Sequence, residues 1–207
     1  MTVLTMDAYH FFRAWMRDPL RVASVTPSGK ALADLIVREI GPQTGRVIEL
    51  GPGTGVFTRA LLRRGVAEED IVLVEMGAEF AALLQQRFPR AQIICTDAAR
   101  IARFCTEPAG AAISGLPLLS MRPTKVFAIL AGTFARLGEG AALYQFTYGF
   151  GCPVPRVVLD RLGLSAVRIG GTLSNVPPAF VYRISRRGEP AKGLLPDPCI
   201  AQSGVFR

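Results

Sequence analysis

A run of seven residues from Glu49 to Gly55 constrains the fold of this chain more than any other part of its sequence. It reads ELGPGTG, follows the short apolar stretch 46–48 and precedes a helical pattern over 56–64. Glycines let the backbone approach a ligand closely, and the first turn of a helix presents unpaired N–H groups to an anion. A strand end, a glycine-rich turn and a helix in this order predict a binding site for a nucleotide-like cofactor.

The spacing of the glycines separates this loop from the dinucleotide-binding fingerprint. That fingerprint reads G-x-G-x-x-G, whereas the third glycine here comes one residue early and an acid precedes the first. The E-x-G-x-G-x-G form resembles motif I of the class I S-adenosylmethionine (SAM) methyltransferases. The resemblance implies SAM as cofactor and S-adenosylhomocysteine as product, with a site lined by Glu49, Gly51, Gly53, Thr54 and Gly55.

Two further acids end strand-like runs along the chain. Glu75 closes an apolar run twenty residues after the third glycine, and we expect it to hold the two ribose hydroxyls, with Met76 beside the adenine. Asp97 follows the next such run and resembles the residue beside the adenine amino group, with Ala98 next to it. Each acid alone could be a helix cap or lie in a solvated loop. Three of them at successive strand ends favour a SAM-type site.

Strand-like and helical segments alternate along the chain, which predicts a parallel sheet with right-handed crossovers. We therefore expect an α/β, Rossmann-like class I SAM methyltransferase fold, with a seven-stranded, mostly parallel sheet flanked by helices and an N-terminal amphipathic helix. Three regions are expected: an amphipathic helix and a cofactor-covering helix in 1–45, the SAM-binding core in 46–187, and a tail in 188–207. The expected strands are 46–50, 71–75, 92–95, 110–114, 141–149, 164–170 and 179–187, and the expected helices include 5–17, 28–40 and 123–137.

Composition narrows the class of protein. Half of the residues are hydrophobic, which argues against disorder, and the single histidine, His10, argues against a histidine-based metal site. The four cysteines show no C-x-x-C spacing and are expected to be reduced and mostly buried. Without a spanning apolar run or a signal peptide, we expect a cytoplasmic protein. The net charge of +8 suits an anionic partner, although an arginine-rich composition can also reflect a GC-rich genome.

The loop after the fourth strand bears on the substrate. It reads SGLPLLSM over 114–121 and resembles the N-L-P-Y loop of the ribosomal RNA adenine dimethylases. In that alignment Gly115 replaces the asparagine, and Leu118 replaces the aromatic ring that stacks on a flipped base. The missing ring argues against a nucleic-acid base as substrate. Ser114 and Leu116 are expected to line the methyl-transfer opening.

The first 21 residues predict an amphipathic helix. One face carries apolar side chains at helical spacing, and the other carries basic ones, with Arg21 following. This pattern is typical of a helix in a membrane interface, where each basic residue adds roughly 1 kcal/mol on an anionic surface. The alternative is a helix packed on its own domain. The apolar face holds Leu4, Ala8, Phe11 and Trp15, and the basic face holds His10, Arg13 and Arg17.

Several segments together resemble the bacterial phospholipid N-methyltransferases of the PmtA type. They are the aromatic prelude YHFFRAW over 9–15, the segment VTPS over 25–28, the SGLP loop and NVPPA over 175–179. The resemblance covers about residues 8–187. It implies methylation of phosphatidylethanolamine and its mono- and dimethyl forms toward phosphatidylcholine, with Pro27 and Ser28 covering the cofactor. The expected partners are the phospholipid and the anionic inner face of the cytoplasmic membrane, bound through residues 1–21, and no nucleic acid. Ribosomal RNA adenine N6-dimethylation and a non-catalytic scaffold are the alternatives.

Methyl transfer to an alkyl amine requires the neutral amine, which is scarce at pH 7 because its pKa lies near ~10. Burial in an apolar pocket would lower that pKa. Tyr148, at the end of the fifth strand, is the candidate to take the proton or orient the lone pair, although it could equally be an aromatic at the rim of the core. Tyr9 and His10 are further catalytic candidates if the first helix acts as a lid. Candidate donors to the lipid phosphate are Arg13, Arg17 and Arg183.

Overall fold

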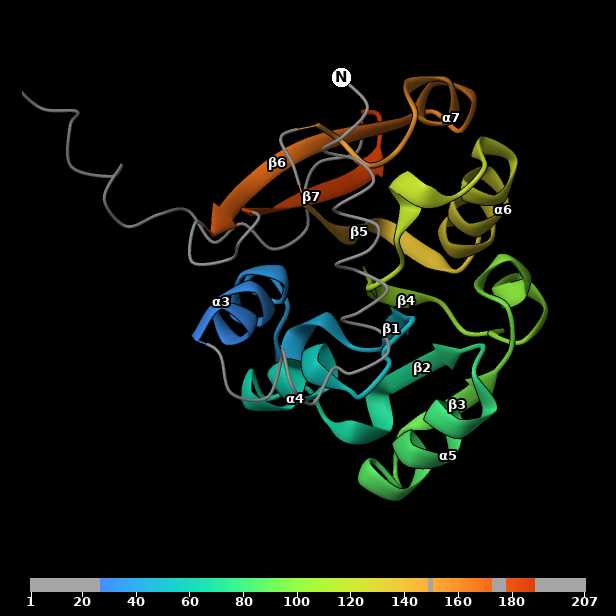
Figure 1. Cartoon of the computed structure of the whole chain (residues 1–207). Coiled ribbons are helices and arrows are strands. Elements are labelled where there is room, and N and C mark those ends of the chain that lie inside the picture. The colour runs from blue at the N-terminus through green and yellow to red at the C-terminus, as the bar shows by residue number, and fades with distance from the viewer. Residues whose placement is uncertain (1–26, 149–150, 173–177, 189–207) are drawn as a thin grey trace, which may run out of the picture.

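The computed structural model describes residues 27–148, 151–172 and 178–188, which form a single sheet with helices on both faces (Figure 1). The strands are β1 (Val47–Leu50), β2 (Ile71–Glu75), β3 (Gln92–Cys95), β4 (Ala109–Ser114), β5 (Leu137–Tyr148), β6 (Leu164–Thr172) and β7 (Ala179–Arg186). The α-helices are α3 (Pro27–Ile36), α4 (Val56–Arg63), α5 (Ala78–Arg87), α6 (Pro123–Phe134) and α7 (Arg156–Arg161). Short 3-10 turns are η1 (Pro42–Thr44), η2 (Glu68–Asp70), η3 (Ala98–Arg103) and η4 (Leu118–Ser120).

The sheet has the strand order β3-β2-β1-β4-β5-β7-β6. The five strands from β3 to β5 are parallel, and β7 runs antiparallel between β5 and β6. The order reverses between β1 and β4, and in open α/β sheets the crevice at such a reversal, beyond the carboxyl ends of the strands, is where ligands bind. The predicted fold class, a mostly parallel seven-stranded α/β sheet, is confirmed.

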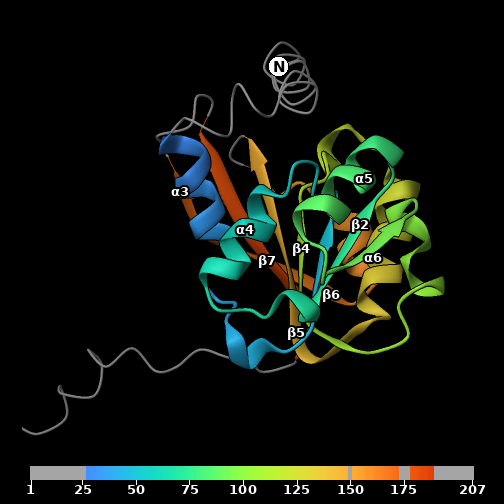
Figure 2. The ribbon, with the colours of Figure 1, turned by 90° about the horizontal axis from the view of Figure 1, so that it is seen from below.

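Two apolar cores lie on opposite faces of the sheet. The helices α3, α4 and α5 cover one face, where Ile36, Leu61 and Leu84 are fully buried. The helices α6 and α7, with η3, cover the other, where Ile101 and Ile129 are buried. Figure 2 shows α3 and α4 on one side of the strands and α6 on the other. The inner strands are mostly apolar because both of their faces are covered. The buried polar exceptions include Glu49, Gln145 and Thr147.

Some element boundaries differ from the expected ones. Helix α3 begins at Pro27, so Ser28 lies inside the helix rather than capping it. Proline suits this place because its fixed φ matches the helix and its missing N–H is not needed there. Strand β5 begins at Leu137, which pairs with Ala109, instead of near 141. The expected helix 5–17 and almost all of the expected tail lie outside the described residues, so the division into three regions stays a prediction.

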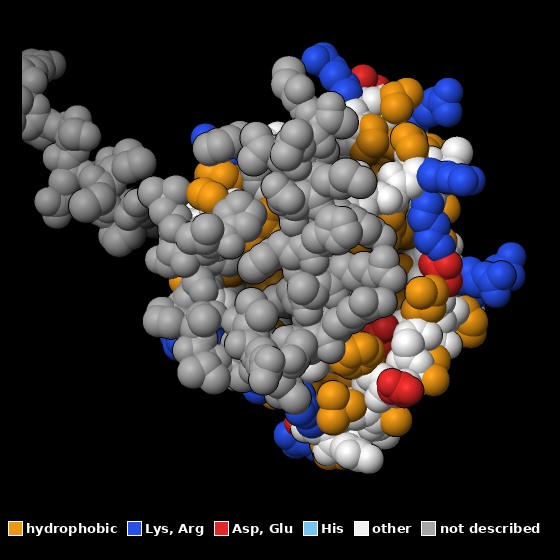
Figure 3. Space-filling view, in the orientation of Figure 1, with side chains coloured by type: hydrophobic (Ala, Val, Ile, Leu, Met, Phe, Trp, Pro, Cys, Tyr) orange, Lys and Arg blue, Asp and Glu red, His pale blue; other side chains and the backbone are white. Residues whose placement is uncertain are grey.

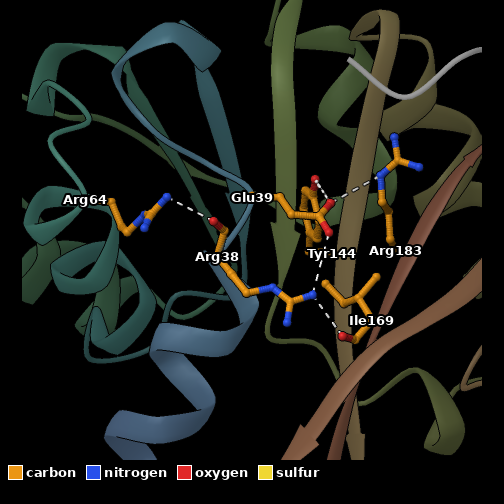
Figure 4. A network of polar contacts seen from close by, with 6 residues as sticks. All are labelled: Arg38, Glu39, Arg64, Tyr144, Ile169 and Arg183. Atoms are coloured by element: carbon orange, nitrogen blue, oxygen red, sulfur yellow. Dashed lines mark hydrogen bonds and ion pairs between the residues drawn. The ribbon is translucent and has the colours of Figure 1, made fainter. Parts of the chain in front are cut away.

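A polar network ties the end of α3 to the far half of the sheet (Figure 4). Glu39 accepts a hydrogen bond from the Tyr144 hydroxyl at 3.0 Å, and its Oε2 lies 3.5 Å from the Arg183 Nε. Burial, together with the nearby Glu39 carboxylate, raises the pKa of Tyr144 well above its usual range. Arg38 donates to the Ile169 carbonyl at 2.9 Å, which links the same turn to β6. The N-terminal side of the described chain is therefore joined to β5, β6 and β7.

Candidate functional site

The glycine-rich loop between β1 and α4 has the backbone that its sequence predicted. Gly51, Gly53 and Gly55 all have positive φ, at 66°, 54° and 78°. A Cβ on Gly51 would lie 2.6 Å from Leu116 Cδ2, whereas a Cβ on Gly53 would meet nothing within 4 Å. Glycine is therefore required by conformation at all three positions, and the space beside Gly53 leaves its backbone open to a ligand.

Glu75, at the end of β2, joins two loops of this site. Its Oε2 accepts a hydrogen bond from the Gly53 N–H at 3.2 Å, and its Oε1 accepts one from the Gly77 N–H at 2.9 Å. The carboxylate therefore lies directly beside the glycine-rich loop, as the order of motifs predicted. The next residue, Met76, is 73% exposed, so it presents an apolar surface to solvent beside that carboxylate.

Glu49 is a buried acid with an unused oxygen. Its side chain is fully buried in β1, and its Oε2 accepts a hydrogen bond from the Thr58 hydroxyl at 2.7 Å. Its Oε1 has no hydrogen-bond partner within the described part of the chain. Burial raises the pKa of Glu49 to about 7, against the opposing effects of Thr58 and Arg59. A carboxyl that changes its charge near neutral pH is therefore placed under the glycine-rich loop.

Two arginines that the sequence did not single out converge on this loop. Arg59 Nη1 donates to the Thr54 carbonyl at 3.0 Å, and Arg87 Nη1 donates to the same oxygen at 2.9 Å. Arg59 lies on α4 and Arg87 at the end of α5. Their shared target depends on how the loop turns, so no spacing in the sequence could have revealed it.

Asp97 lies after β3 and is held by two donors. Its Oδ1 accepts a hydrogen bond from the Ala99 N–H at 2.9 Å, and its Oδ2 forms an ion pair with Lys125 of α6. Burial pushes the pKa of Asp97 upward, but the donors from Lys125 and Ala99 outweigh it, so the pKa lies below its usual value. Each carboxylate oxygen can accept a second hydrogen bond. The buried Ala98 follows directly.

The SGLP loop lies against the glycine-rich loop. A Cβ on Gly115 would lie 2.6 Å from the Gly51 carbonyl oxygen, so these two backbones touch. Ser114 is buried, and its Oγ accepts a hydrogen bond from the Leu116 N–H at 3.2 Å. Leu118, which aligns with the stacking ring of the adenine dimethylases, is only 2% exposed and belongs to the core. It is therefore not available to stack on a base.

Other predicted residues lie at or beyond the edge of this site. Tyr148 ends β5, and its ring packs edge-on against Phe146 with centroids 5.6 Å apart. Arg183 forms an ion pair with Glu39 through its Nε and is only 15% exposed, and its role as a donor to a lipid phosphate stays a prediction. Pro27 and Ser28 form the start of α3. Tyr9, His10, Arg13 and Arg17 lie outside the described residues.

Three of the cysteines lie in the described ranges, and all three are free thiols. Cys105 is buried, Cys152 is half-buried and Cys95 is exposed, so burial is less general than expected. Within the described ranges, no group of three or more His, Cys, Asp or Glu residues has the arrangement of a metal site. None of the helices in the same ranges combines the length and hydrophobicity that crossing a bilayer requires.

Comparison with known sequences gives two kinds of partial match, and no family model matches the chain. The ornithine lipid N-methyltransferase of Singulisphaera acidiphila is 28% identical over 159 residues, which are 69% of this chain and 83% of that protein. The ribosomal RNA small subunit methyltransferase A of a Synechococcus species is 35% identical over 94 residues. That match covers 44% of this chain but only 31% of the RNA enzyme.

Comparison with solved structures supports the architecture. The N-methyltransferase NodS from Bradyrhizobium japonicum, solved with S-adenosylhomocysteine, superposes with a TM-score of 0.62 at 16% identity. The match covers 87% of this chain and 98% of NodS. A TehB-like SAM-dependent methyltransferase from Corynebacterium glutamicum gives a TM-score of 0.60 at 14% identity, covering 88% and 100% of the two chains. The chain thus has the fold of the class I SAM-dependent methyltransferases.

Proposed function

We propose that this protein is a SAM-dependent N-methyltransferase that acts on the amine of a membrane lipid. The observation that carries the proposal is the match to a lipid N-methyltransferase along 83% of that relative. The lipid we propose is phosphatidylethanolamine with its mono- and dimethyl forms, toward phosphatidylcholine, as the PmtA-type resemblance implies. Ornithine lipid, the substrate in the name of the relative, is the second candidate headgroup.

The residues of the site fit SAM. The open backbone at Gly53 offers room for a ligand beside the Glu75 carboxylate, and the buried Glu49 Oε1 lacks a partner that a ligand could supply. When bound, SAM would supply an electrophilic methyl group to the lone pair of the neutral amine and would leave as the neutral thioether S-adenosylhomocysteine. The product of a primary or secondary amine would then release one proton, whereas the quaternary product of the dimethyl lipid would have none to release. The chain must hold the two reactants in line and admit the neutral amine.

Each site residue then has a proposed task. The loop Gly51–Gly55 and Glu49 hold the methionine end, Glu75 holds the ribose hydroxyls, and Met76 and Ala98 flank the adenine. Asp97 accepts from the adenine amine through a lone pair that Lys125 and Ala99 leave unused. Ser114 and Leu116 line the opening to the amine, and Pro27 and Ser28 begin the helix that covers the cofactor.

A membrane-bound substrate suits the charge of the protein. Lys and Arg side chains gather along one margin of the molecule over α6 and α7 (Figure 3). Arg122 directly precedes α6, and Arg156 and Arg161 lie on α7; all three residues are exposed. Basic residues near an anionic bilayer add roughly 1 kcal/mol each to membrane binding. We propose that this margin and residues 1–21 together place the protein on the cytoplasmic face of the membrane.

Ribosomal RNA adenine methylation is the alternative, favoured by the match of 94 residues to an RNA enzyme. That match spans less than a third of the enzyme, and the residue at the stacking position, Leu118, is buried in the core. The lipid proposal therefore accounts for more of the chain.

The deciding experiment incubates the purified protein with methyl-labelled SAM and one of three acceptors: vesicles with phosphatidylethanolamine, vesicles with ornithine lipid, or unmodified ribosomal RNA. Label in the phosphatidylethanolamine vesicles supports the proposal as stated. Label only in ornithine lipid would move the proposal to the other headgroup, and label in RNA would overturn it.

A further inference from the structure

Strand β5 extends beyond its neighbour at the proposed opening. The pairing of β4 with β5 ends at Ser114 and Gln145, while β5 continues to Tyr148. On its other side, β5 stays paired with β7 through Thr147 and Tyr148. The last residues of β5 thus border the SGLP loop instead of a strand, and that loop touches Gly51 of the cofactor loop.

Gln145 holds the SGLP loop with one end of its amide. Its Nε2 donates to the Leu116 carbonyl at 3.0 Å and to the Phe146 carbonyl at 2.7 Å. Both partners are acceptors, so the amide nitrogen must face them and both of its N–H groups are used. The other end, Oε1, is buried and has no partner in the described residues.

Thr147, two residues after Gln145, also has a buried side-chain oxygen without a partner in the described part of the chain. This oxygen is Oγ1, and the residue is 4% exposed. Residues two apart on a strand point to the same face, so Thr147 and Gln145 share one face while Tyr148 points to the other. Buried polar atoms are nearly always hydrogen-bonded, so two oxygens on the same face of β5 that lack partners in the described ranges could accept the N–H groups of a ligand.

We infer that Gln145 Oε1 and Thr147 Oγ1 accept the N–H bonds of the amine that is methylated. This inference rests on the proposed function and adds the residues that orient the substrate. Both acceptors are uncharged. A carboxylate in their place would favour the ammonium form, which has no lone pair, whereas an amide and a hydroxyl bind N–H groups with less effect on the pKa. In the N-L-P-Y loop an asparagine carries a side-chain amide, and this chain has Gly115 at that position. Gln145 would supply the amide instead, from the neighbouring strand.

The number of N–H bonds on the amine makes the inference testable. The reactive, neutral form of phosphatidylethanolamine has two N–H bonds, the monomethyl lipid has one and the dimethyl lipid has none. Removing an acceptor should therefore slow the first methylation most and the third least. Thr147→Val removes only the hydroxyl at nearly constant shape, and Gln145→Met removes the amide.

The experiment measures kcat/KM of wild type, Thr147→Val and Gln145→Met on vesicles of each of the three lipids. For Thr147→Val we expect the ratio of variant to wild type to fall to about one tenth for phosphatidylethanolamine, the worth of one hydrogen bond, and to stay near one for the dimethyl lipid. Gln145→Met also removes the bond to the Leu116 carbonyl, so it should slow all three methylations, the first most and the third least. Thr147→Ser should restore the wild-type pattern. Thr133→Val is the matched control, because that buried hydroxyl bonds to the Ile129 carbonyl within α6 and should change no ratio.

A binding measurement without turnover accompanies the kinetics. By saturation-transfer NMR, glycerophosphoethanolamine should bind wild type better than glycerophosphocholine does, and Thr147→Val should lose the difference. Equal losses on all three lipids would assign Gln145 and Thr147 to loop support and overturn the inference. If wild type methylates only ornithine lipid, the same comparison is made with ornithine lipid and its monomethyl and dimethyl forms. A wild type that methylates neither series would instead overturn the proposed function.

Discussion

Lys125 of α6 forms an ion pair with Asp97, the acid that follows β3, and so links the adenine side of the proposed site to the helix behind the SGLP loop. Both side chains are about one-third exposed, at 38% and 31%. Such a pair contributes at most about 1 kcal/mol to stability. Its position suggests that it orients the Asp97 carboxylate more than it stabilises the fold.

The role of Asp97 predicts a preference at the purine ring. Adenine presents an amino group to the carboxylate, whereas hypoxanthine presents an oxygen that the carboxylate repels. Wild type should therefore bind S-adenosylhomocysteine at least about tenfold more tightly than S-inosylhomocysteine, and Asp97→Ala should lose most of that preference. Calorimetric titration with both nucleosides measures it. Equal affinities in wild type would remove Asp97 from the adenine site, and Lys125→Met serves as a control that keeps the carboxylate.

Glu75 should be required for cofactor affinity. Replacing it by alanine should weaken SAM binding by roughly 1.5–3 kcal/mol, the range for hydrogen bonds to a charged group. The structure adds a second cause, since the same carboxylate holds the Gly53 and Gly77 N–H groups. Calorimetry measures the affinity. Glu79→Ala is the matched control, because that exposed acid on α5 gives the same change of charge. An unchanged affinity in Glu75→Ala would refute the assignment.

Glu49 should make stability depend on pH. Its folded pKa is raised from 4.5 to about 7, so the folded protein keeps a proton that the unfolded chain releases, and stability falls as pH rises through this window. The cost, up to about 3 kcal/mol, is complete above pH 7. Glu49→Gln should therefore be more stable than wild type at pH 8 and equal to it at pH 4. Urea unfolding of the cofactor-free protein at pH 4 and pH 8 tests this. If Glu49→Gln and wild type differ in the free energy of unfolding by the same amount at both pH values, titration of Glu49 is not the cause.

Tyr148→Phe separates a proton role from a packing role. Phenylalanine keeps the edge contact with Phe146 but lacks the hydroxyl, so folding and SAM affinity should stay at wild-type values. If the hydroxyl takes the proton or orients the amine, turnover should fall by about 100-fold, the lower range for general acid–base catalysis. Single-turnover assays with labelled SAM measure the step. A normal rate would show that Tyr148 serves only at the rim of the core.

The N-terminal segment should provide membrane affinity. Deleting residues 1–17 removes the predicted aromatic and basic faces but none of the described sheet, so binding to anionic vesicles should be lost while the unfolding transition persists. Co-sedimentation with anionic and with zwitterionic vesicles measures the first, and circular dichroism the second. If the shortened protein still sediments with anionic vesicles, residues 1–17 are not the membrane anchor, and the basic margin over α6 and α7 becomes the candidate.

Much of the fold could be predicted because strand periodicity and the glycine loop are local signals. The runs ending at Glu75 and Cys95 were placed to the residue, since apolar strands between polar turns have sharp borders. The start of β5 was missed because Gly138 and Gly140 resemble a turn, yet Leu137 already pairs with Ala109. Tertiary pairing overrides such local preference.

The site was only partly predictable. Glu75 and Gly53 could be placed together because parallel strands end at one edge of the sheet. The contacts of Lys125 and Gln145 could not be predicted. Lys125 pairs with Asp97, 28 residues before it, and Gln145 bonds to the Leu116 carbonyl, 29 residues before it. The ion pair of Arg183 with Glu39 was not predictable either, because Glu39 lies more than a hundred residues earlier in the sequence. Long-range pairs of polar residues leave no periodic trace in the sequence.

The last described strand, β7, lies inside the sheet and not at its edge, so the integrity of the whole sheet depends on it. It fills the slot between β5 and β6, so a chain that stops before residue 179 would have a gap inside its sheet instead of a shorter edge. Both borders of that gap would expose unpaired backbone, to which a strand from another copy could add. Premature termination before β7 should thus produce oligomers that associate through these unpaired strand edges rather than a slightly smaller monomer.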